Sequence, residues 1–349
     1  MNILKTVNRI PGGLMIVPLL LGATINSFFP QVLEIGGFTQ AAFKDGASAI
    51  IGIFLLIMGS QLTVKSTGPV VQKGFAILLG KLVAGVAVGL VVGFLIPGGV
   101  LWSLTPLAII AAMINSNGGL FAALTKEFGN KTDRGTFPII ALNDGPFFTL
   151  VVLGAAGLAD VPFVALISVI IPILIGFILG NLDPRIREFL RPGESVLIPF
   201  FAFPLGTGID FGDIIAAGPP GVLLGIMTVA LSGGGAMLFL HLIHVVKRTP
   251  RERRNLISGA AESSTAGNAV ATPAVVASID PAYSEIAGIA TTQVAGAVVT
   301  TAILTPVLTT LIYKWQMKRG IDPQLEHPGD ASTQTHSDAR ARAESTDPQ

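Results

Sequence analysis

The sequence predicts an all-α protein that crosses a membrane several times. About half of its 349 residues (51%) are apolar and only 12% are charged, whereas roughly 25% of an ordinary soluble domain is charged. The apolar residues form continuous runs, most of them close to the ~20 residues that a helix needs to cross a bilayer. A transmembrane barrel would show shorter segments of alternating polarity instead.

Ten apolar runs qualify as spans. The seventh run is short and the ninth is polar for a span. The ten runs are residues 10–29, 46–62, 74–96, 104–124, 136–158, 161–182, 195–209, 221–246, 256–276 and 286–313.

The basic residues predict the orientation of these spans. Loops on the cytoplasmic side of a membrane are enriched in Lys and Arg. Here Lys and Arg occur at both chain ends and in every second connection, whereas the other connections carry only Lys44. We therefore expect both termini to be cytoplasmic. Residues 321–349 are polar and poor in apolar residues, which predicts a disordered cytoplasmic tail.

Short motifs recur between the two halves of the chain. Residues 17–22 (VPLLLG) resemble residues 171–176 (IPILIG), and residues 58–62 resemble residues 205–209. Chance recurrence of Pro and Gly is the alternative, but the matches keep one order and a nearly constant offset. We interpret residues 1–158 and 159–320 as two five-helix repeats. An odd number of spans inverts the second repeat, which is typical of secondary transporters.

The fourth and ninth spans are predicted to be broken helices. Span four contains Asn115-Ser116-Asn117-Gly118-Gly119, and span nine contains a polar run over residues 262–268. Inside lipid such a break survives only where the freed main-chain groups meet protein, water or ligand. Helix N-termini at the breaks would favour an anion such as a carboxylate. Close packing of small residues is the alternative, and it does not explain the Asn residues or Glu262.

The candidate substrate-binding residues lie at these two breaks and in the spans that follow them in each repeat. They are the small or polar residues of spans four, five, nine and ten: Asn115, Asn117, Gly118, Gly119, Asn143, Ser263, Ser264, Thr265, Gly267, Asn268 and Gln293.

Three ionisable residues inside the spans are candidates for coupling transport to an ion. Asp144 and Glu262 are the only carboxylates placed inside the membrane, and Lys81 is the only base. A low-dielectric environment favours the neutral form of a carboxylate, which suits a proton carrier. Carboxylate, hydroxyl and amide oxygens could equally hold Na⁺. For Lys81, snorkelling or a structural ion pair is the alternative.

Other functions are disfavoured by what the chain lacks. It has no Cys, no phosphate-binding loop of the ATPase type and no intramembrane His to activate a serine, so we expect neither an enzyme, a cofactor nor a metal site. The pair His241 and His244 is interpreted as interfacial, since a third metal ligand is missing. A net charge of +1 gives no reason to expect nucleic acid. A channel is less favoured because of the inverted repeat.

Six motifs, in order within residues 1–318, carry a resemblance to a known family. They are Ile10-Pro11-Gly12-Gly13, Asn117-Gly118-Gly119-Leu120, Gly180-Asn181-Leu182-Asp183-Pro184, Arg187-Glu188-Phe189, Leu197-Ile198-Pro199-Phe200-Phe201-Ala202-Phe203 and Ala269-Val270-Ala271-Thr272-Pro273. These segments resemble those of the 2-keto-3-deoxygluconate permeases.

The resemblance implies a carrier in the bacterial inner membrane that takes up 2-keto-3-deoxygluconate together with protons. It also implies kinship with the bile-acid/sodium symporter fold, in which the fourth and ninth spans are broken and cross. The lipid bilayer is the expected surrounding, and no obligatory protein partner is evident. A sodium-coupled carrier of another organic acid or uronate remains the alternative.

Overall fold

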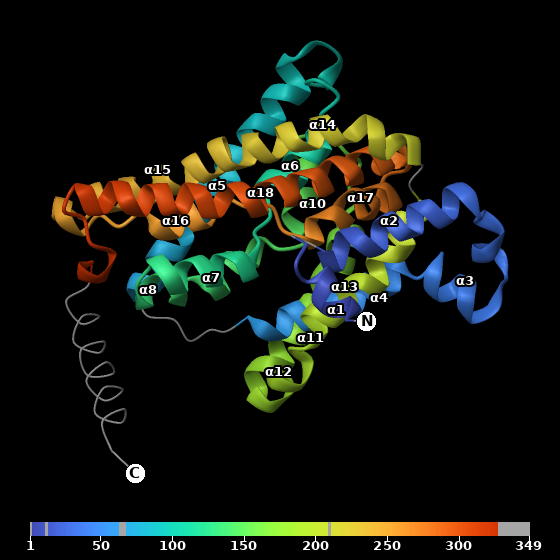
Figure 1. Cartoon of the computed structure of the whole chain (residues 1–349), viewed down its shortest axis with the longest axis horizontal. Helices are drawn as coiled ribbons and strands as arrows, with labels where there is room; N and C mark the ends of the chain where they lie inside the picture. The colour runs from blue at the N-terminus through green and yellow to red at the C-terminus, as the bar shows by residue number, and fades with distance from the viewer. Residues whose placement is uncertain (1, 11–12, 63–67, 209–210, 327–349) are drawn as a thin grey trace.

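The computed structural model describes residues 2–10, 13–62, 68–208 and 211–326, and these residues form helices joined by short turns (Figure 1). Within these ranges there is no strand, and the only β-type pairing is an isolated bridge between Leu101 and Leu104. The predicted all-α class is therefore confirmed.

In chain order the helices of the first half are α1 (Ile3–Val7), α2 (Gly13–Phe28), η1 (Pro30–Glu34), α3 (Gly37–Phe43), α4 (Ala47–Gln61), α5 (Gly68–Leu95), η2 (Pro97–Gly99), α6 (Pro106–Ile114), α7 (Gly118–Phe128), α8 (Lys131–Gly135), α9 (Phe137–Ile140), η3 (Ala141–Asn143) and α10 (Phe147–Ala155). The long helices of residues 1–158 lie within or close to the predicted apolar runs, whereas α1, α3 and α8 lie outside them.

The second half continues in the same way. Its helices are α11 (Phe163–Leu182), α12 (Pro184–Leu190), α13 (Gly193–Gly206), α14 (Phe211–Met227), η4 (Thr228–Ser232, a π-helical turn), α15 (Gly233–Val246), η5 (Arg251–Arg253), α16 (Ile257–Ala261), η6 (Asn268–Ala271), α17 (Thr272–Ile279), η7 (Pro281–Tyr283), α18 (Ser284–Lys318) and η8 (Pro323–Leu325).

Several of these helices are long and apolar enough to cross a membrane. Among the described residues five stretches meet this criterion without a sharp bend, and up to seven do so if each bent helix pair is one span. The helices α2 and α13, together with the stretch η6–α17, are apolar but shorter. The chain thus has the helices of a multi-pass membrane protein.

The helices gather in two groups (Figure 1). Helix α4 packs along α11, and α2 packs along α13. In the other group α14 packs along α18, while α5 packs against α15 and α6. The chain therefore pairs helices that are far apart in sequence, and the interrupted segments lie where the two groups meet.

Glycines allow the close approach of α4 and α11. A Cβ atom on Gly176 would lie 1.8 Å from the carbonyl oxygen of Leu56, and one on Gly59 would lie 2.1 Å from that of Ile173. Gly22 and Gly206 play the same part between α2 and α13. Small residues that let two backbones meet are a common basis of helix association in membranes.

Span five contains a break that the sequence analysis did not predict. The segment Lys131–Asn143 and α10 meet at an angle of 54°. The chain is extended at Asp144, and Gly145 has a φ of +88°, a conformation that favours glycine. The run Asn143-Asp144-Gly145-Pro146 was the available signal, because Gly and Pro at successive positions mark a turn.

The start of the segment predicted to be a disordered tail has a defined structure. Ile321 is buried, and η8 follows it and packs against the turn η5. Residues 327–349, the remainder of that predicted tail, lie outside the described residues.

We predict that Gly176→Ala lowers the thermal stability of the detergent-solubilised protein. The added methyl group forces α4 and α11 apart, and overpacking of this kind costs about 1–3 kcal/mol. Gly52→Ala is the matched control, since no atom lies within 4 Å of a Cβ at Gly52, which also belongs to α4. The loss of stability is measured as the unfolding temperature, by size-exclusion chromatography of samples heated to increasing temperatures. Equal values for the two variants would contradict the packing described.

Candidate functional site

The first interrupted helix ends at Ile114, where α6 stops. The last four carbonyl groups of a helix have no partner within it. All four carbonyls at this end accept hydrogen bonds from side chains: Ala111 from Asn115 Nδ2 (2.9 Å), Ala112 from Thr265 Oγ1 (3.0 Å), Met113 from Ser232 Oγ (2.7 Å) and Ile114 from Asn143 Nδ2. The break is therefore fully supported on this side by polar side chains from the residue after α6, from η3, from the π-helical turn η4 and from the segment that follows α16.

The second interrupted helix ends at Ala261, where α16 stops, and Lys81 supports it. The fully buried Nζ of Lys81 donates to the carbonyl oxygens of Glu262 (2.8 Å) and Ser264 (2.6 Å). It also lies 3.2 Å from Oε1 of Glu262, with both side chains completely buried. The carbonyl between them, that of Ser263, accepts from Thr305 Oγ1 at 3.0 Å.

The two breaks contact each other directly. The amide of Asn117 donates to Oγ of Ser264 at 3.2 Å. The hydroxyl of Ser116 contacts Oε1 of Glu262, and it also lies 2.7 Å from Oδ1 of Asn143. The polar segments of spans four, five and nine thus form one continuous hydrogen-bonded unit.

A cavity of about 550 Å³ opens beside this unit. The N-terminal end of α7 faces it, with the side chain of Asn117 accepting from the amide of Leu120 at 3.1 Å. For the Gly118 and Gly119 amides, which also line the cavity, the structure shows no acceptor among the described residues. The start of η6 supplies Gly267 and Asn268 from the opposite break.

Asp144 is the carboxylate that reaches the cavity. Its Oδ1 accepts from the amide of Ser116 at 3.3 Å, and its side chain is half-buried. Glu262 lies behind it and is completely buried. Ser116 is therefore placed between the two carboxylates, with its amide on one and its hydroxyl on the other.

The predicted site residues divide into three sets by position. Five of the eleven candidate substrate-binding residues line the cavity: Asn117, Gly118, Gly119, Gly267 and Asn268. Five support the breaks from within: Asn115, Asn143, Ser263, Ser264 and Thr265. Gln293 lies elsewhere, since its Nε2 donates to the carbonyl of Ser103 at 2.8 Å.

The cavity also contains residues that the sequence analysis did not single out. Asn8 and Glu194 are polar, and Met58, Phe54 and Phe137 provide apolar walls. The Nδ2 of Asn268 reaches only the sulfur of Met58, at 3.4 Å, and its buried Oδ1 has no hydrogen-bond partner in the described structure. Glu194 follows Pro192-Gly193 directly before an apolar run, and this position was the only signal for it.

The two histidines take different positions. His244 is buried, and its Nε2 lies 3.0 Å from the carbonyl oxygen of Asn255, whereas His241 is half-buried. In the described part of the chain no group of three or more His, Cys, Asp or Glu side chains is arranged to hold a metal ion.

Comparison with known proteins gives a consistent result. The family described as 2-keto-3-deoxygluconate permease matches residues 4–318. The 2-keto-3-deoxygluconate permease 1 of Salmonella typhimurium is 50% identical over 319 residues, which is 91% of this chain and 98% of the relative. The 2-keto-3-deoxygluconate permease of Bacillus subtilis is 39% identical over 331 residues, covering 93% and 98% of the two chains. That of Escherichia coli is 36% identical over 323 residues, covering 91% and 95%.

These relatives are permeases and not enzymes, in agreement with the prediction from the sequence. The match extends over both interrupted segments and over every helix from α2 to α18. The chain therefore belongs to the 2-keto-3-deoxygluconate permease family.

Proposed function

We propose that the chain is a secondary active transporter that takes up 2-keto-3-deoxygluconate together with protons across the bacterial inner membrane. The family and the names of its relatives support the substrate. The observation that carries the choice of coupling ion is the position of Lys81 at the second break.

The cavity has the chemistry that a small sugar acid requires. Its volume of about 550 Å³ falls in the range of about 300–1,000 Å³ that is usual for small-molecule sites. The amides at the start of α7 and the positive end of its dipole favour a carboxylate. The side chains of Asn117 and Asn268 are available for the hydroxyl groups. Among the candidate residues, these two and Gly118, Gly119 and Gly267 are the ones that we propose bind substrate directly.

Lys81 favours a proton over Na⁺ as the coupling ion. Main-chain carbonyls freed at a broken helix, together with a carboxylate oxygen, are the ligands that Na⁺ uses in transporters of this kind. Here the ammonium of Lys81 takes two such carbonyls and faces Glu262 Oε1. An ammonium donates three hydrogen bonds, and these three oxygens account for them. The chain thus supplies its own cation where Na⁺ would otherwise bind.

The charges of the unit support exchange of one proton. Lys81 offsets one of the two carboxylates, and a second buried negative charge is costly unless a proton neutralises it. Ser116 has one hydroxyl hydrogen but contacts two acceptors, Asn143 Oδ1 and Glu262 Oε1. A proton on Glu262 satisfies both contacts. A proton taken up by either carboxylate lowers the negative charge that a substrate carboxylate meets beside the cavity, so substrate and proton bind cooperatively.

The packing supports two inverted five-helix repeats, ten spans in all, with cytoplasmic termini. The repeat pairs span one with span six and span two with span seven. It therefore maps the contact between α2 and α13 onto the contact between α11 and α4, and both contacts are made through glycines. In this proposal the group containing α2, α4, α11 and α13 moves against the group containing the breaks, which exposes the cavity to each side in turn.

Substitution of the two carboxylates tests the coupling. We expect Asp144→Asn and Glu262→Gln to lower proton-driven accumulation of labelled 2-keto-3-deoxygluconate in proteoliposomes. A coupling free energy of about 1–3 kcal/mol between proton and substrate corresponds to a change of roughly 5- to 150-fold in substrate affinity. Counterflow, in which external label exchanges for internal unlabelled substrate, needs no net proton movement and should persist.

Glu285→Gln is the matched control for these variants, because Glu285 is exposed at the start of α18. It should accumulate substrate as the unaltered protein does. Full proton-driven accumulation by both the Asp144 and the Glu262 variants would show that neither carboxylate carries the proton.

Substitution of Asn268 tests substrate binding. Asn268→Ala should weaken substrate affinity roughly 2- to 10-fold, the loss of one hydrogen bond between neutral groups. Asn181→Ala is the control, since that amide donates to the carbonyls of Leu62 (2.9 Å) and Phe177 (2.8 Å) away from the cavity. Isothermal titration of the purified proteins with substrate measures both affinities. An unchanged affinity in the Asn268 variant would remove this residue from the site.

A further inference from the structure

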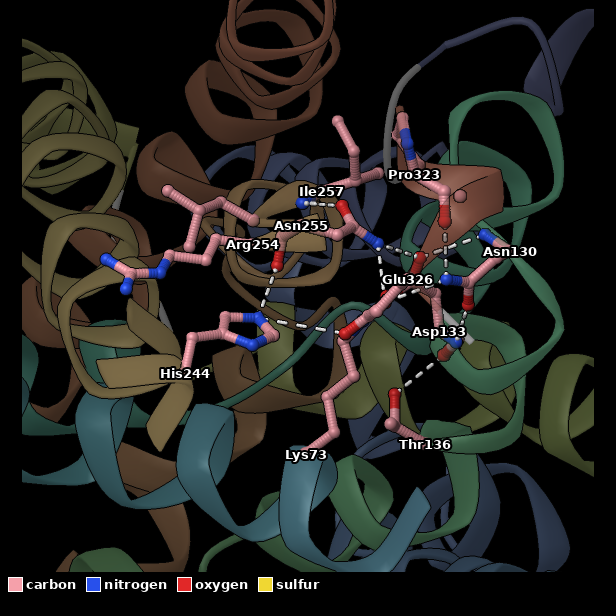
Figure 2. Close-up of polar contacts among 12 residues, drawn as sticks. Lys73, Asn130, Asp133, Thr136, His244, Arg254, Asn255, Ile257, Pro323 and Glu326 are labelled. Atoms are coloured by element: carbon pink, nitrogen blue, oxygen red, sulfur yellow. Dashed lines mark hydrogen bonds and ion pairs between the residues drawn. The ribbon is translucent and has the colours of Figure 1, made fainter. Parts of the chain in front are cut away.

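A buried ionic cluster surrounds Lys73, near the N-terminal end of α5 (Figure 2). Its centre is the carboxylate of Glu326, which follows η8 and is 7% exposed. Oε2 of Glu326 accepts from Lys73 Nζ (2.5 Å), Asn130 Nδ2 (2.7 Å) and Asn255 Nδ2 (3.0 Å). On its other side Oε1 lies 3.7 Å from Nε2 of His244.

The donors that meet Glu326 come from segments distant in sequence. Lys73 belongs to α5, Asn130 precedes α8, and Asn255 precedes α16. Glu326 thus joins three parts of the helical body to the end of the described chain. Further contacts of the same segment run from Gln324 Nε2 to the carbonyl of Gly129 (3.0 Å) and from Asn130 Nδ2 to that of Pro323 (2.8 Å).

Each donor is also held in place by bonds that do not involve Glu326. Asn130 and Asp133 cap α8 reciprocally, with 2.8 Å and 2.9 Å between side-chain oxygen and amide. Asn255 accepts from the amide of Ile257 (2.9 Å) and donates to Asp133 Oδ2 (2.7 Å). Lys73 Nζ lies 2.5 Å from Asp133 Oδ1. The positions of the donors therefore do not depend on the carboxylate of Glu326. Donors that are held in place before a ligand binds favour its binding.

A route from the surface leads to this cluster. A cavity of about 320 Å³ is lined by Lys73, His244 and Glu326 from the cluster and by Lys247, Arg248 and Arg253. The last three residues make no salt bridge within the part of the chain that the structure describes. Their positive charge attracts small anions from solution toward the cluster.

We propose that Lys73, Asn130 and Asn255 form an anion-binding niche for a carboxylate, and that Glu326 is its tethered ligand. The niche fastens the segment from Ile321 to Glu326 onto the helical body. When the side chain of Glu326 is removed, a small free carboxylate takes its place. Lys73 is already paired with Asp133, so the vacated niche keeps its donors without an uncompensated charge.

Thiol labelling of the full-length chain tests this proposal, since the sequence contains no Cys. Ile321→Cys places the single thiol at a position that is 6% exposed in the fastened segment. We expect Glu326→Ala in this background to raise the rate of maleimide labelling at least roughly tenfold, because hydrogen bonds to charged groups are lost. Sodium acetate should slow labelling of this variant again, because acetate reproduces the atoms that the substitution removes beyond Cβ.

The controls separate anion binding from general salt effects and from loss of fold. Sodium chloride at the same concentration should not slow labelling of the Glu326→Ala variant, and acetate should not affect the chain that retains Glu326. Glu252→Ala, at an exposed position of η5, should label at the rate of the parent. Glu326→Gln keeps the niche filled by a neutral group and should show faster labelling without an acetate effect.

Two results would overturn the proposal. An unchanged labelling rate in the Glu326→Ala and Glu326→Gln variants would show that Glu326 does not fasten the segment. Faster labelling on which acetate and chloride act equally would show that no carboxylate niche exists.

Discussion

Polar main-chain groups need partners inside a bilayer, and this constraint governs the centre of the molecule. Two helices stop within the helical body and start again, which leaves carbonyl groups without partners in their own helices. The carbonyls at the end of α6 are all capped by side chains, and those following α16 are held chiefly by Lys81. Because these supports come from α5, η3, η4, α18 and the segments that follow α6 and α16, the breaks also join the helices that surround them.

Helix α5 connects the two ionic features of the chain. Lys81 donates to the main chain at the second break. Lys73, about two turns away along the helix, pairs with Asp133 and Glu326 in the ionic cluster. Both ammonium groups are buried and paired with carboxylates, and Lys81 also donates hydrogen bonds to two main-chain carbonyls. Breaking a buried pair by removing one partner is costly. We therefore infer that both lysines stabilise the arrangement of the helices, while only Lys81 contacts the hydrogen-bonded unit beside the cavity.

Sequence reasoning could identify the helical class and the two polar interruptions, because hydropathy and runs of Gly, Asn and Ser are local signals. It could not distinguish a side chain that faces the cavity from one that caps the main chain. Asn115 and Thr265 have the same hydrogen-bonding chemistry as Asn117 and Asn268, and only the approach of distant helices separates their positions. Glu326 illustrates the same limit: its segment is polar in sequence, yet its carboxylate is buried by donors from three remote segments.

We propose that Lys81 provides the cation where the two breaks meet, so that a proton and not Na⁺ drives uptake. The most direct measurement is uptake of labelled 2-keto-3-deoxygluconate into proteoliposomes under separately imposed proton and sodium gradients. We expect accumulation above the external concentration with an inward proton gradient, and none with an inward sodium gradient at equal pH on both sides. Accumulation driven by sodium alone would contradict this proposal.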